Sequence, residues 1–369
     1  MTIKKNFQRK FKIFFQFLFH LVYGKVQLAP KTDKSKIKII ETKKIIIAQR
    51  EYNINYNIYE IPNARVFTDL VEHVAIIKDN YILPNISYQQ INGELKDVSF
   101  NKVLKYGTTR IKKKFHGNLL SLVQGASGNN YFHFLFDIIT KLKIVESEYS
   151  LNNIDYFYVP GIFDWQKKIL STLDINQNKL VDSKKYRHIS ADNIIAVDHP
   201  WYQKGTVQDE ILNIPDWIIF YLRDKFLQYS QKFNCSDKIF IDRSDSIFNH
   251  CKLINNQEVV NFLSDNGFES YQVSKLNFFE QIYLFNNAKI IIGPHGAAFS
   301  NIIFSKKGLK LVELIPSDHL SKKCEKISNL LNFEYQKIKL NKEIDKNINT
   351  VGDIKIEISD LRKILKQIL

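Results

Sequence analysis

A turn in the C-terminal half, G-P-H-G at Gly293–Gly296, carries residues that suit the binding of a phosphate. Apolar runs at 288–292 and 309–314 enclose it, and such short runs are typical of parallel strands buried on both faces. Glycine allows backbone N–H groups to approach a ligand closely. A helix expected to open at Ala297 would add N–H groups and the positive end of its dipole. The pattern predicts an anion site, and it fits equally a ligand-free turn between a strand and a helix.

Two charged residues are expected at the same edge of this sheet. Arg243 follows a predicted strand at 238–242, and Glu313 lies near the end of strand 309–314. Ligands of open α/β sheets bind at the carboxyl ends of the strands. Arg243 would therefore offer a fork of donors to phosphate, and Glu313 would accept hydrogen bonds from ribose hydroxyls. The alternatives are structural, because Arg243 would also be satisfied by a neighbouring aspartate and Glu313 by a lysine.

The N-terminal half offers His133 and Asp137, which are four residues apart on a helix predicted at 130–146 and so share one face. Either side chain can take a proton from a hydroxyl group within hydrogen-bond reach, and either can orient the other. The surrounding sequence is rich in aromatic residues, so a satisfied core histidine is the alternative. A metal site is disfavoured because no third ligand is apparent nearby.

Several motifs together resemble those of the family 61 glycosyltransferases. The most specific is G-P-H-G-A-A-x-x-N followed by a strand that ends L-V-E-L-I-P. Further matches occur upstream in the family's order, and the resemblance spans roughly residues 50 to 340: Asn130-Tyr131-Phe132-His133 with Asp137, Arg243, Ile254-Asn255, Glu258, Gly267-Phe268, and F-x-E-Q-I-x-L-F at 278–285.

One position departs from the family pattern. The family usually carries two arginines before Ile254-Asn255, and this chain has Cys251 and Lys252 there. Lys252 keeps one positive charge but lacks the two-pronged geometry of a guanidinium group.

The resemblance implies an α/β protein with two Rossmann-like domains that face each other across a cleft, the GT-B arrangement. It implies an inverting transfer, with His133 and Asp137 as catalytic residues and Asn130 and Tyr131 on the acceptor side. His295 and Asn301 would order the turn or touch phosphate or sugar. The expected donor-binding set is Arg243, Lys252, Gly293, His295, Gly296, Ala297, Asn301 and Glu313.

No D-x-D element occurs in a context that suggests a metal-held diphosphate, since the nearest approach, 242–245, has the wrong spacing. We therefore expect no metal and no other cofactor, with the nucleotide sugar as co-substrate. The three cysteines form no C-x-x-C pair, which indicates reduced thiols and no zinc site.

The positive charge is concentrated near the N-terminus. Residues 1–50 hold thirteen Lys or Arg and only two acidic residues, which is +11 of the chain's net +15. Within 1–24 an aromatic run follows a basic start but is shorter than the ~20 apolar residues of a membrane span. We expect an interfacial helix that attaches the protein to the inner, anionic face of the cytoplasmic membrane. An ordinary packed helix is one alternative, and a signal peptide is another, disfavoured because no small-x-small cleavage site follows.

The expected organisation has four parts. Residues 1–30 form the membrane-associating segment, 31–205 an acceptor-side α/β domain, 206–345 a Rossmann-like domain for the nucleotide sugar, and 346–369 a tail helix. The expected activity is extension of a surface polysaccharide or glycolipid in the cytoplasm by a bacterial-type transferase. A non-catalytic sugar- or nucleotide-binding subunit of an envelope assembly complex is the alternative. Nucleic-acid binding is disfavoured because the folded part lacks a basic stripe with interleaved aromatic residues.

Overall fold

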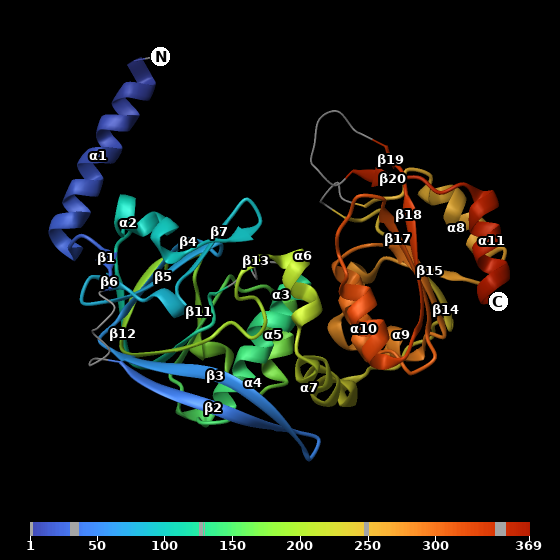
Figure 1. Cartoon of the computed structure of the whole chain (residues 1–369), viewed down its shortest axis with the longest axis horizontal. Helices are drawn as coiled ribbons and strands as arrows, with labels where there is room; N and C mark the ends of the chain where they lie inside the picture. The colour runs from blue at the N-terminus through green and yellow to red at the C-terminus, as the bar shows by residue number, and fades with distance from the viewer. Residues whose placement is uncertain (1–2, 30–36, 125–127, 129, 247–250, 344–351) are drawn as a thin grey trace. The chain divides into compact units, whose positions relative to one another are not determined.

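The structure is a computed structural model that describes residues 3–29, 37–124, 128, 130–246, 251–343 and 352–369. The chain divides into two compact units, Met1–Glu210 (unit 1) and Ile211–Leu369 (unit 2). Each unit combines helices with a β-sheet (Figure 1), which confirms the mixed α/β class. The two units are described separately.

Unit 2 is built on a five-stranded sheet in which every pair of neighbours is parallel. The strand order is β15-β14-β16-β17-β18, so the first strand, β14, lies inside the sheet. The chain adds β15 on one side of β14 and then continues on the other side with β16, so the order of the strands reverses between β14 and β16. This is the doubly wound order in which ligands bind beside the carboxyl ends of the strands at the reversal. The strands are β14 (Lys238–Ile241), β15 (Glu269–Tyr271), β16 (Ile290–Pro294), β17 (Lys310–Pro316) and β18 (Glu334–Leu340).

Helices connect these strands. A capping box starts one of them: Asn277 accepts hydrogen bonds from the N–H groups of Phe279 and Glu280, and Glu280 accepts one from the N–H of Asn277. The last helix packs its apolar side into the core with Phe240 and Ile292. The helices are α7 (Asp216–Phe226), α8 (Asn256–Ser264), α9 (Phe278–Asn287), α10 (Lys323–Leu331) and α11 (Ile358–Ile368). The shorter elements are η6 (Ile211–Asn213), η7 (Leu227–Tyr229), η8 (Val273–Lys275), the 3-10 helix η9 (Ala297–Phe304), and strands β19 (Lys342–Glu343) and β20 (Asp353–Ile354).

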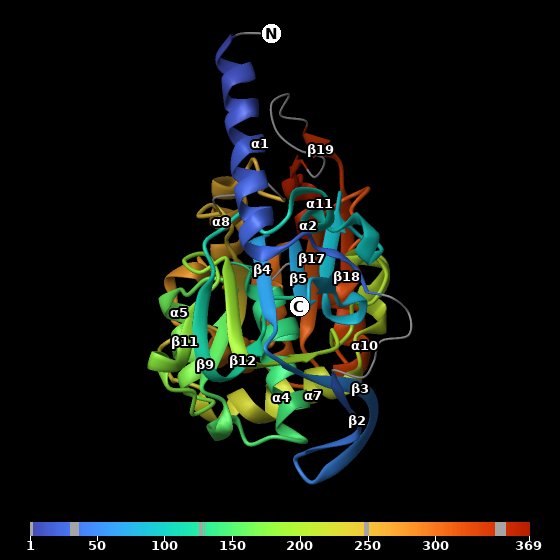
Figure 2. The ribbon, with the colours of Figure 1, turned by 90° about the vertical axis from the view of Figure 1, so that its left-hand side faces the viewer.

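Unit 1 contains a thirteen-stranded mixed sheet. Its parallel part is β11-β10-β9-β12, and β3 and β4 pair with β12 in the antiparallel sense. Figure 2 shows β9, β12 and β4 side by side. The strands are β1 (Gln27–Leu28), β2 (Lys38–Ile47), β3 (Arg50–Pro62), β4 (Arg65–Leu70), β5 (His73–Lys78), β6 (Tyr81–Ile82), β7 (Tyr88–Ile91), β8 (Glu94–Leu95), β9 (Lys113–Ser121), β10 (Tyr156–Val159), β11 (Leu180–Asp182), β12 (His188–Val197) and β13 (Gly205–Thr206).

One helical stretch of unit 1 changes its winding along its length. It begins as α3 (Tyr131–His133), continues as the π-helical η3 (Phe134–Ile139) and ends as α4 (Thr140–Glu146). π-helical turns occur frequently at functional sites. The remaining helices of unit 1 are α2 (Lys102–Tyr106), α5 (Asp164–Ser171), α6 (Val207–Glu210), η1 (Pro84–Ile86), η2 (Val98–Phe100), η4 (Leu151–Asn153) and η5 (Gln177–Lys179).

The N-terminal helix α1 (Ile3–Tyr23) is held to unit 1 by its last turn. The carbonyl of Tyr23 accepts a hydrogen bond from Arg65 at 3.0 Å, and the Tyr23 ring lies 4.8 Å from the ring of His188. One side of α1 is apolar and exposed, and it includes Ile13, Phe14, Phe17, Leu18, Leu21 and Val22. None of the helices in the described ranges has the length and hydropathy needed to cross a membrane.

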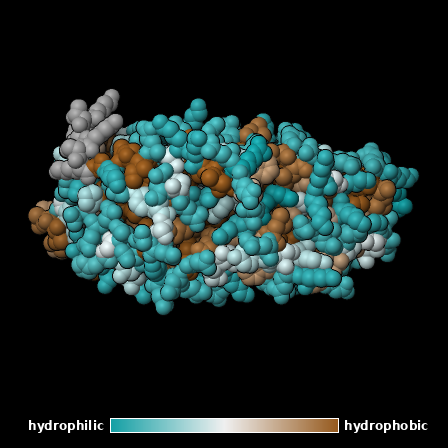
Figure 3. Space-filling view, turned by 90° about the horizontal axis from the view of Figure 1, so that it is seen from below, coloured by the Kyte–Doolittle hydropathy of each residue, from teal (hydrophilic) through white to brown (hydrophobic). Residues whose placement is uncertain are grey.

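Hydrophilic side chains cover most of the face drawn in Figure 3, with separate hydrophobic patches among them. The large apolar side chains are mainly internal. In unit 1 one core cluster joins Phe67 and Ile77 of the sheet to Val103 of α2.

Candidate active site

The turn at Gly293–Gly296 lies where the sheet of unit 2 reverses. A Cβ atom at Gly293 would lie 2.8 Å from the Cβ of Ile241, so this glycine is required for the approach of β14 to β16. A Cβ atom at Gly296 would lie 1.5 Å from Nη1 of Arg243. Gly296 therefore makes room for the guanidinium group, and Arg243 lies directly against the turn.

Arg243 is partly buried. Burial lowers its pKa, and the nearby Cys251 and Asp245 act in the opposite direction. The carboxylate of the preceding Asp242 accepts hydrogen bonds from Ser244 at 2.8 Å and 2.9 Å. Asp242 is thus engaged with its own loop, while the guanidinium group is directed at Gly296.

A second cation, Lys323, lies on the other side of the turn. Its Nζ donates hydrogen bonds to the carbonyl of Gly296 at 2.9 Å and to Oγ of Ser300 at 3.4 Å. Burial lowers its pKa. Sequence reasoning missed this residue because Lys323 stands in a polar, lysine-rich stretch, where a lysine is normally exposed.

Glu313 is enclosed by hydrogen-bond donors. Its Oε1 accepts from Nδ1 of His295 at 2.5 Å and from Sγ of Cys324 at 3.1 Å, and its Oε2 accepts from the hydroxyl of Tyr335 at 2.5 Å. Its side chain is 1% exposed. Burial alone would raise the pKa of Glu313, but these bonds and the charge of His295 outweigh it and lower the pKa to about 2.

This arrangement differs from the expectation that Glu313 binds the hydroxyl groups of a ribose. Both carboxylate oxygens are already engaged, and the side chain does not reach the surface. Glu313 instead holds the imidazole of His295 through Nδ1. The second nitrogen of that ring, Nε2, is not used in this contact. The ring of His295 also lies 4.4 Å from that of His319.

The same cluster contains three residues of metal-binding types. The ligand atoms of His295, Glu313 and Cys324 lie within 4.8 Å of one another. Burial and the neighbouring carboxylate raise the pKa of the Cys324 thiol well above its usual value. A protonated thiol is a hydrogen-bond donor, whereas a metal needs the thiolate. In this structure the three side chains are joined by hydrogen bonds to Glu313.

We expect Glu313→Gln to lower the free energy of unfolding by about 3 kcal/mol at neutral pH, because charged hydrogen bonds and a buried ion pair are weakened. The folded-state pKa is depressed, so the contribution of Glu313 is full above the ordinary value of 4.5 and is lost as the pH falls towards 2. Urea titrations should show a deficit that shrinks as the pH falls below 4.5. Glu334→Gln, at an exposed position on β18, is the control. A deficit that is constant with pH, or absent, would contradict this role.

The remaining expected donor residues have different environments. Asn301 is fully buried and its Nδ2 donates to Oε1 of Gln281 at 2.9 Å, so it joins η9 to α9. Ala297 is half-buried and begins a 3-10 helix at the position where the sequence predicted a short helix. The backbone N–H of Lys252 donates to Asp353 at 3.0 Å. Asn301 thus links η9, the helix that follows the turn, to α9.

Unit 1 places a second polar network on its π-helical segment. Nδ1 of His133 lies 2.9 Å from Oδ2 of Asp137, and Nε1 of Trp201 donates to Oδ1 of Asp137 at 2.8 Å. Nε2 of His199 lies 3.5 Å from the same Oδ2. Asp137 and its three partners are all buried. The pair expected from the sequence is therefore in contact, within a larger network.

The hydrogen-bond partners assign the tautomers of both histidines. Nδ1 of His199 accepts from the backbone N–H of Tyr202 at 2.9 Å, which assigns its proton to Nε2, towards Asp137. His133 donates from Nδ1 to Asp137, and a neutral imidazole in this tautomer has its lone pair on Nε2. Burial alone would raise the pKa of Asp137, but the two imidazoles outweigh it and hold that pKa far below its usual range. Asp137 is therefore an anion that orients His133.

Lys141 lies one helical turn beyond Asp137 and is fully buried. Its Nζ donates to the carbonyl of Gln124 at 2.8 Å. Burial lowers its pKa to about 7, although the charge of Asp137 opposes this shift. Its position four residues after Asp137 on one helix was the available signal. His199 and Trp201 gave none, because they are distant in sequence and their segment reads as a turn-rich linker.

The two residues expected on the acceptor side have local roles. Oδ1 of Asn130 accepts from the N–H groups of Phe132 and His133 at 3.0 and 3.3 Å and so caps the helix that carries the network. The ring of Tyr131 lies 5.7 Å from that of Trp165. The cap fixes where the helix begins and thereby where His133 lies.

Comparison with known proteins decides the family. The family model described as Glycosyltransferase 61 matches residues 131–312. The chain belongs to glycosyltransferase family 61. The match begins next to the His133 network and extends through the glycine turn to β17. Family membership implies glycosyltransferase activity. No curated protein matches the chain.

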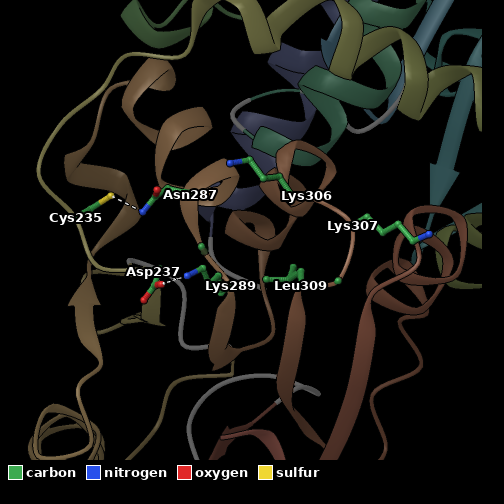
Figure 4. A pocket seen from close by; sticks show the side chains of 9 residues that line it. Cys235, Asp237, Asn287, Lys289, Lys306, Lys307 and Leu309 are labelled. Carbon is green, nitrogen blue, oxygen red and sulfur yellow. Dashed lines mark hydrogen bonds and ion pairs between the residues drawn. The ribbon is translucent and has the colours of Figure 1, made fainter.

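A separate hollow of about 550 Å³ lies at the opposite edge of the sheet of unit 2 (Figure 4). It is bordered by Asp237, Lys289 and Leu309, which directly precede β14, β16 and β17. Asp237 and Lys289 form an ion pair at 2.9 Å. The hollow is thus at the amino ends of the strands, away from the glycine turn at their carboxyl ends, and belongs to a different site.

Proposed function

We propose that this family 61 member is an inverting, metal-independent transferase that moves a hexosyl or pentosyl group from a nucleotide sugar to a glycan or glycolipid acceptor. The observation that carries the donor half is the guanidinium group of Arg243 against Gly296, at the point where the parallel sheet reverses. The GT-B arrangement is part of this proposal. It is supported by the doubly wound order of unit 2.

On the donor side, the leaving group is a nucleoside diphosphate whose negative charge grows as the glycosidic bond breaks. Arg243 supplies a rigid fork of N–H donors, and Lys323 adds a second positive charge beneath the turn. The opening turn of η9 adds N–H groups without partners inside the helix. These groups stabilise the developing charge, so the proposal needs no bound ion.

On the acceptor side, we assign His133 as the base and Asp137 as its positioning residue. With its proton on Nδ1, His133 presents the lone pair of Nε2 to an acceptor hydroxyl. The oxygen attacks the anomeric carbon from the face opposite the diphosphate, its proton moves to Nε2, and the C–O bond to the diphosphate breaks. Asp137 stabilises the imidazolium that results. One displacement of this kind inverts the anomeric configuration.

The test of the donor site is thermal unfolding with a panel of nucleotide sugars. A ligand at one hundred times its dissociation constant adds about 2.7 kcal/mol to the free energy of unfolding. We expect at least one nucleotide sugar to stabilise the wild-type chain and to stabilise Arg243→Lys much less. A panel without any stabilising compound would contradict the proposal. Stabilisation by a nucleotide sugar without any transfer would favour the non-catalytic subunit.

We also propose that α1 lies in the interface of an anionic membrane at its cytoplasmic face, where it would bring the protein to a glycolipid or surface-polysaccharide acceptor. The support is its exposed apolar side, which includes Phe17 at 59% and Leu21 at 68% exposure. Basic residues dominate the N-terminal segment of the sequence. Apolar side chains with flanking positive charge are typical of interfacial helices.

Phe17→Glu and Leu21→Glu are each expected to weaken binding to anionic lipid vesicles about tenfold or more, because each removes a side chain whose burial is worth about 1.5–3 kcal/mol. Co-sedimentation with the vesicles measures this. Phe100→Glu changes an apolar residue of unit 1 that is 58% exposed and is the matched control. If the two α1 variants co-sediment with the vesicles as much as the control does, the membrane assignment is contradicted.

A further inference from the structure

Unit 1 contains a cavity of about 540 Å³ close to the Asp137 network. Its volume lies within the roughly 300–1,000 Å³ of small-molecule sites. The walls come from β3, from the start of β7 and from the segment that follows β12. The side chains that define its chemistry are Asn57, Tyr59, Tyr88, Gln124, Asp198 and Tyr202.

A firmly oriented carboxylate forms one wall. Oδ2 of Asp198 accepts from both the backbone N–H and the side-chain amide of Asn57 at 2.8 Å, and Oδ1 accepts from the hydroxyl of Tyr59 at 3.0 Å. A carboxylate oxygen can accept two hydrogen bonds, so Oδ1 keeps capacity for a ligand donor. Burial raises the pKa of Asp198, although the bonds from Asn57 oppose the shift.

Aromatic rings form the inner wall. The ring of Tyr88 lies 6.2 Å from that of Tyr202 and 6.3 Å from that of His199. The hydroxyl of Tyr202 donates to the carbonyl of Gly205 at 2.8 Å, which fixes the side chain. These rings are almost fully buried and fix the shape of the cavity, whose amides and carboxylate suit a ligand with many hydroxyl groups.

The charges that line the cavity balance. Asp97 and Asp198 are acidic, Lys96 and Lys204 are basic, and Lys96 is paired with Glu94 at 2.5 Å. The lining therefore offers no excess of positive charge to a phosphate. The cavity therefore suits an uncharged ligand rich in hydroxyl groups, and the nucleotide sugar is not its occupant.

The cavity adjoins the Asp137 network through His199. His199 lines it and directs Nε2 towards Asp137 at 3.5 Å, and Asp137 orients His133. His133 itself does not line the cavity. A ligand held there would thus lie beside the base network without being the group that reacts.

We propose that this cavity is a saccharide subsite that holds a non-reacting, uncharged sugar residue of the acceptor. This inference rests on the proposed transferase function. Binding energy from a remote part of a substrate can be used to position the reacting hydroxyl.

The binding test uses saturation-transfer NMR on the full chain with methyl glycosides of hexoses and N-acetylhexosamines. Gln203→Trp places a large ring at an exposed position that lines the cavity, and Gln208→Trp makes the same change at an exposed position outside it. We expect signals from at least one glycoside with the wild-type chain and with Gln208→Trp, and their loss with Gln203→Trp. Absence of signals from the wild-type chain, or their survival in Gln203→Trp, overturns the proposal.

Transfer kinetics add a second readout. Asp198→Asn removes the charge but keeps the shape of the side chain, and we expect the KM for the acceptor to rise about tenfold, because a hydrogen bond to a charged group is lost. An unchanged KM overturns the subsite. Failure of the transferase function would be seen separately, as the absence of nucleoside diphosphate release from every donor while glycoside signals persist.

Discussion

His133→Gln is expected to lower kcat by about 10²- to 10⁴-fold, the range typical of general-base catalysis. Glutamine can still donate a hydrogen bond to Asp137, so the buried anion keeps a partner, but it has no lone pair basic enough to take the hydroxyl proton. Release of nucleoside diphosphate in the presence of acceptor measures the effect. The change should fall on kcat, because the imidazole acts in the transition state.

The control for this variant is His116→Gln. His116 is 76% exposed and lies 3.3 Å from Asp192, away from the Asp137 network. Full activity in His133→Gln, together with normal donor binding, would remove His133 as the base. The chain would then still be a transferase, and its base would be another residue.

Arg243→Lys is expected to lower kcat by about 10²- to 10³-fold, which is the usual effect of losing one donor to a developing negative charge. Lysine keeps the positive charge but replaces a planar fork by a point charge. Gly296→Ala should act in the same direction without changing any charge. The added Cβ atom would lie 1.5 Å from Nη1 of Arg243 and would displace it. Steady-state kinetics with the stabilising nucleotide sugar measure both variants.

Arg362→Lys is the matched control, because Arg362 is an exposed residue of α11 whose guanidinium lies over the ring of Phe262. If Arg243→Lys and Gly296→Ala retained the activity of this control, the guanidinium would have no part in the reaction. An effect in Arg243→Lys alone would mean that the turn tolerates a methyl group there.

Much of unit 2 could be predicted because local signals agree with the structure. The strand expected at 238–242 is β14, and the strand expected at 309–314 is β17. Short apolar runs in the sequence mark both strands. The strand order could not be predicted, because it depends on contacts between segments that are distant along the chain.

In unit 1 a long hairpin was missed. β2 ends at Ile47 and β3 begins at Arg50. The two residues between them, Ala48 and Gln49, both have positive φ, 46° and 65°. Turns of this kind usually contain glycine or asparagine. The turn signal was therefore absent from the sequence.

In the candidate sites too, contacts between residues close in sequence could be predicted, and contacts between distant residues could not. The contact of His133 with Asp137 followed from their spacing on one helix. The role of Glu313 did not, because the Cys324 and Tyr335 that occupy its oxygens come from elements further along the chain. This packing buries the side chain of Glu313. Glu313 therefore supports His295 and does not face a ribose.

The central claim is that Arg243, Lys323 and the glycine turn neutralise the departing diphosphate without a bound ion. The most direct test is the rate of nucleoside diphosphate release in excess EDTA, compared with the rate after addition of Mg²⁺ or Mn²⁺. Equal rates are predicted. Loss of release in EDTA, with recovery when either cation is restored, would contradict the claim.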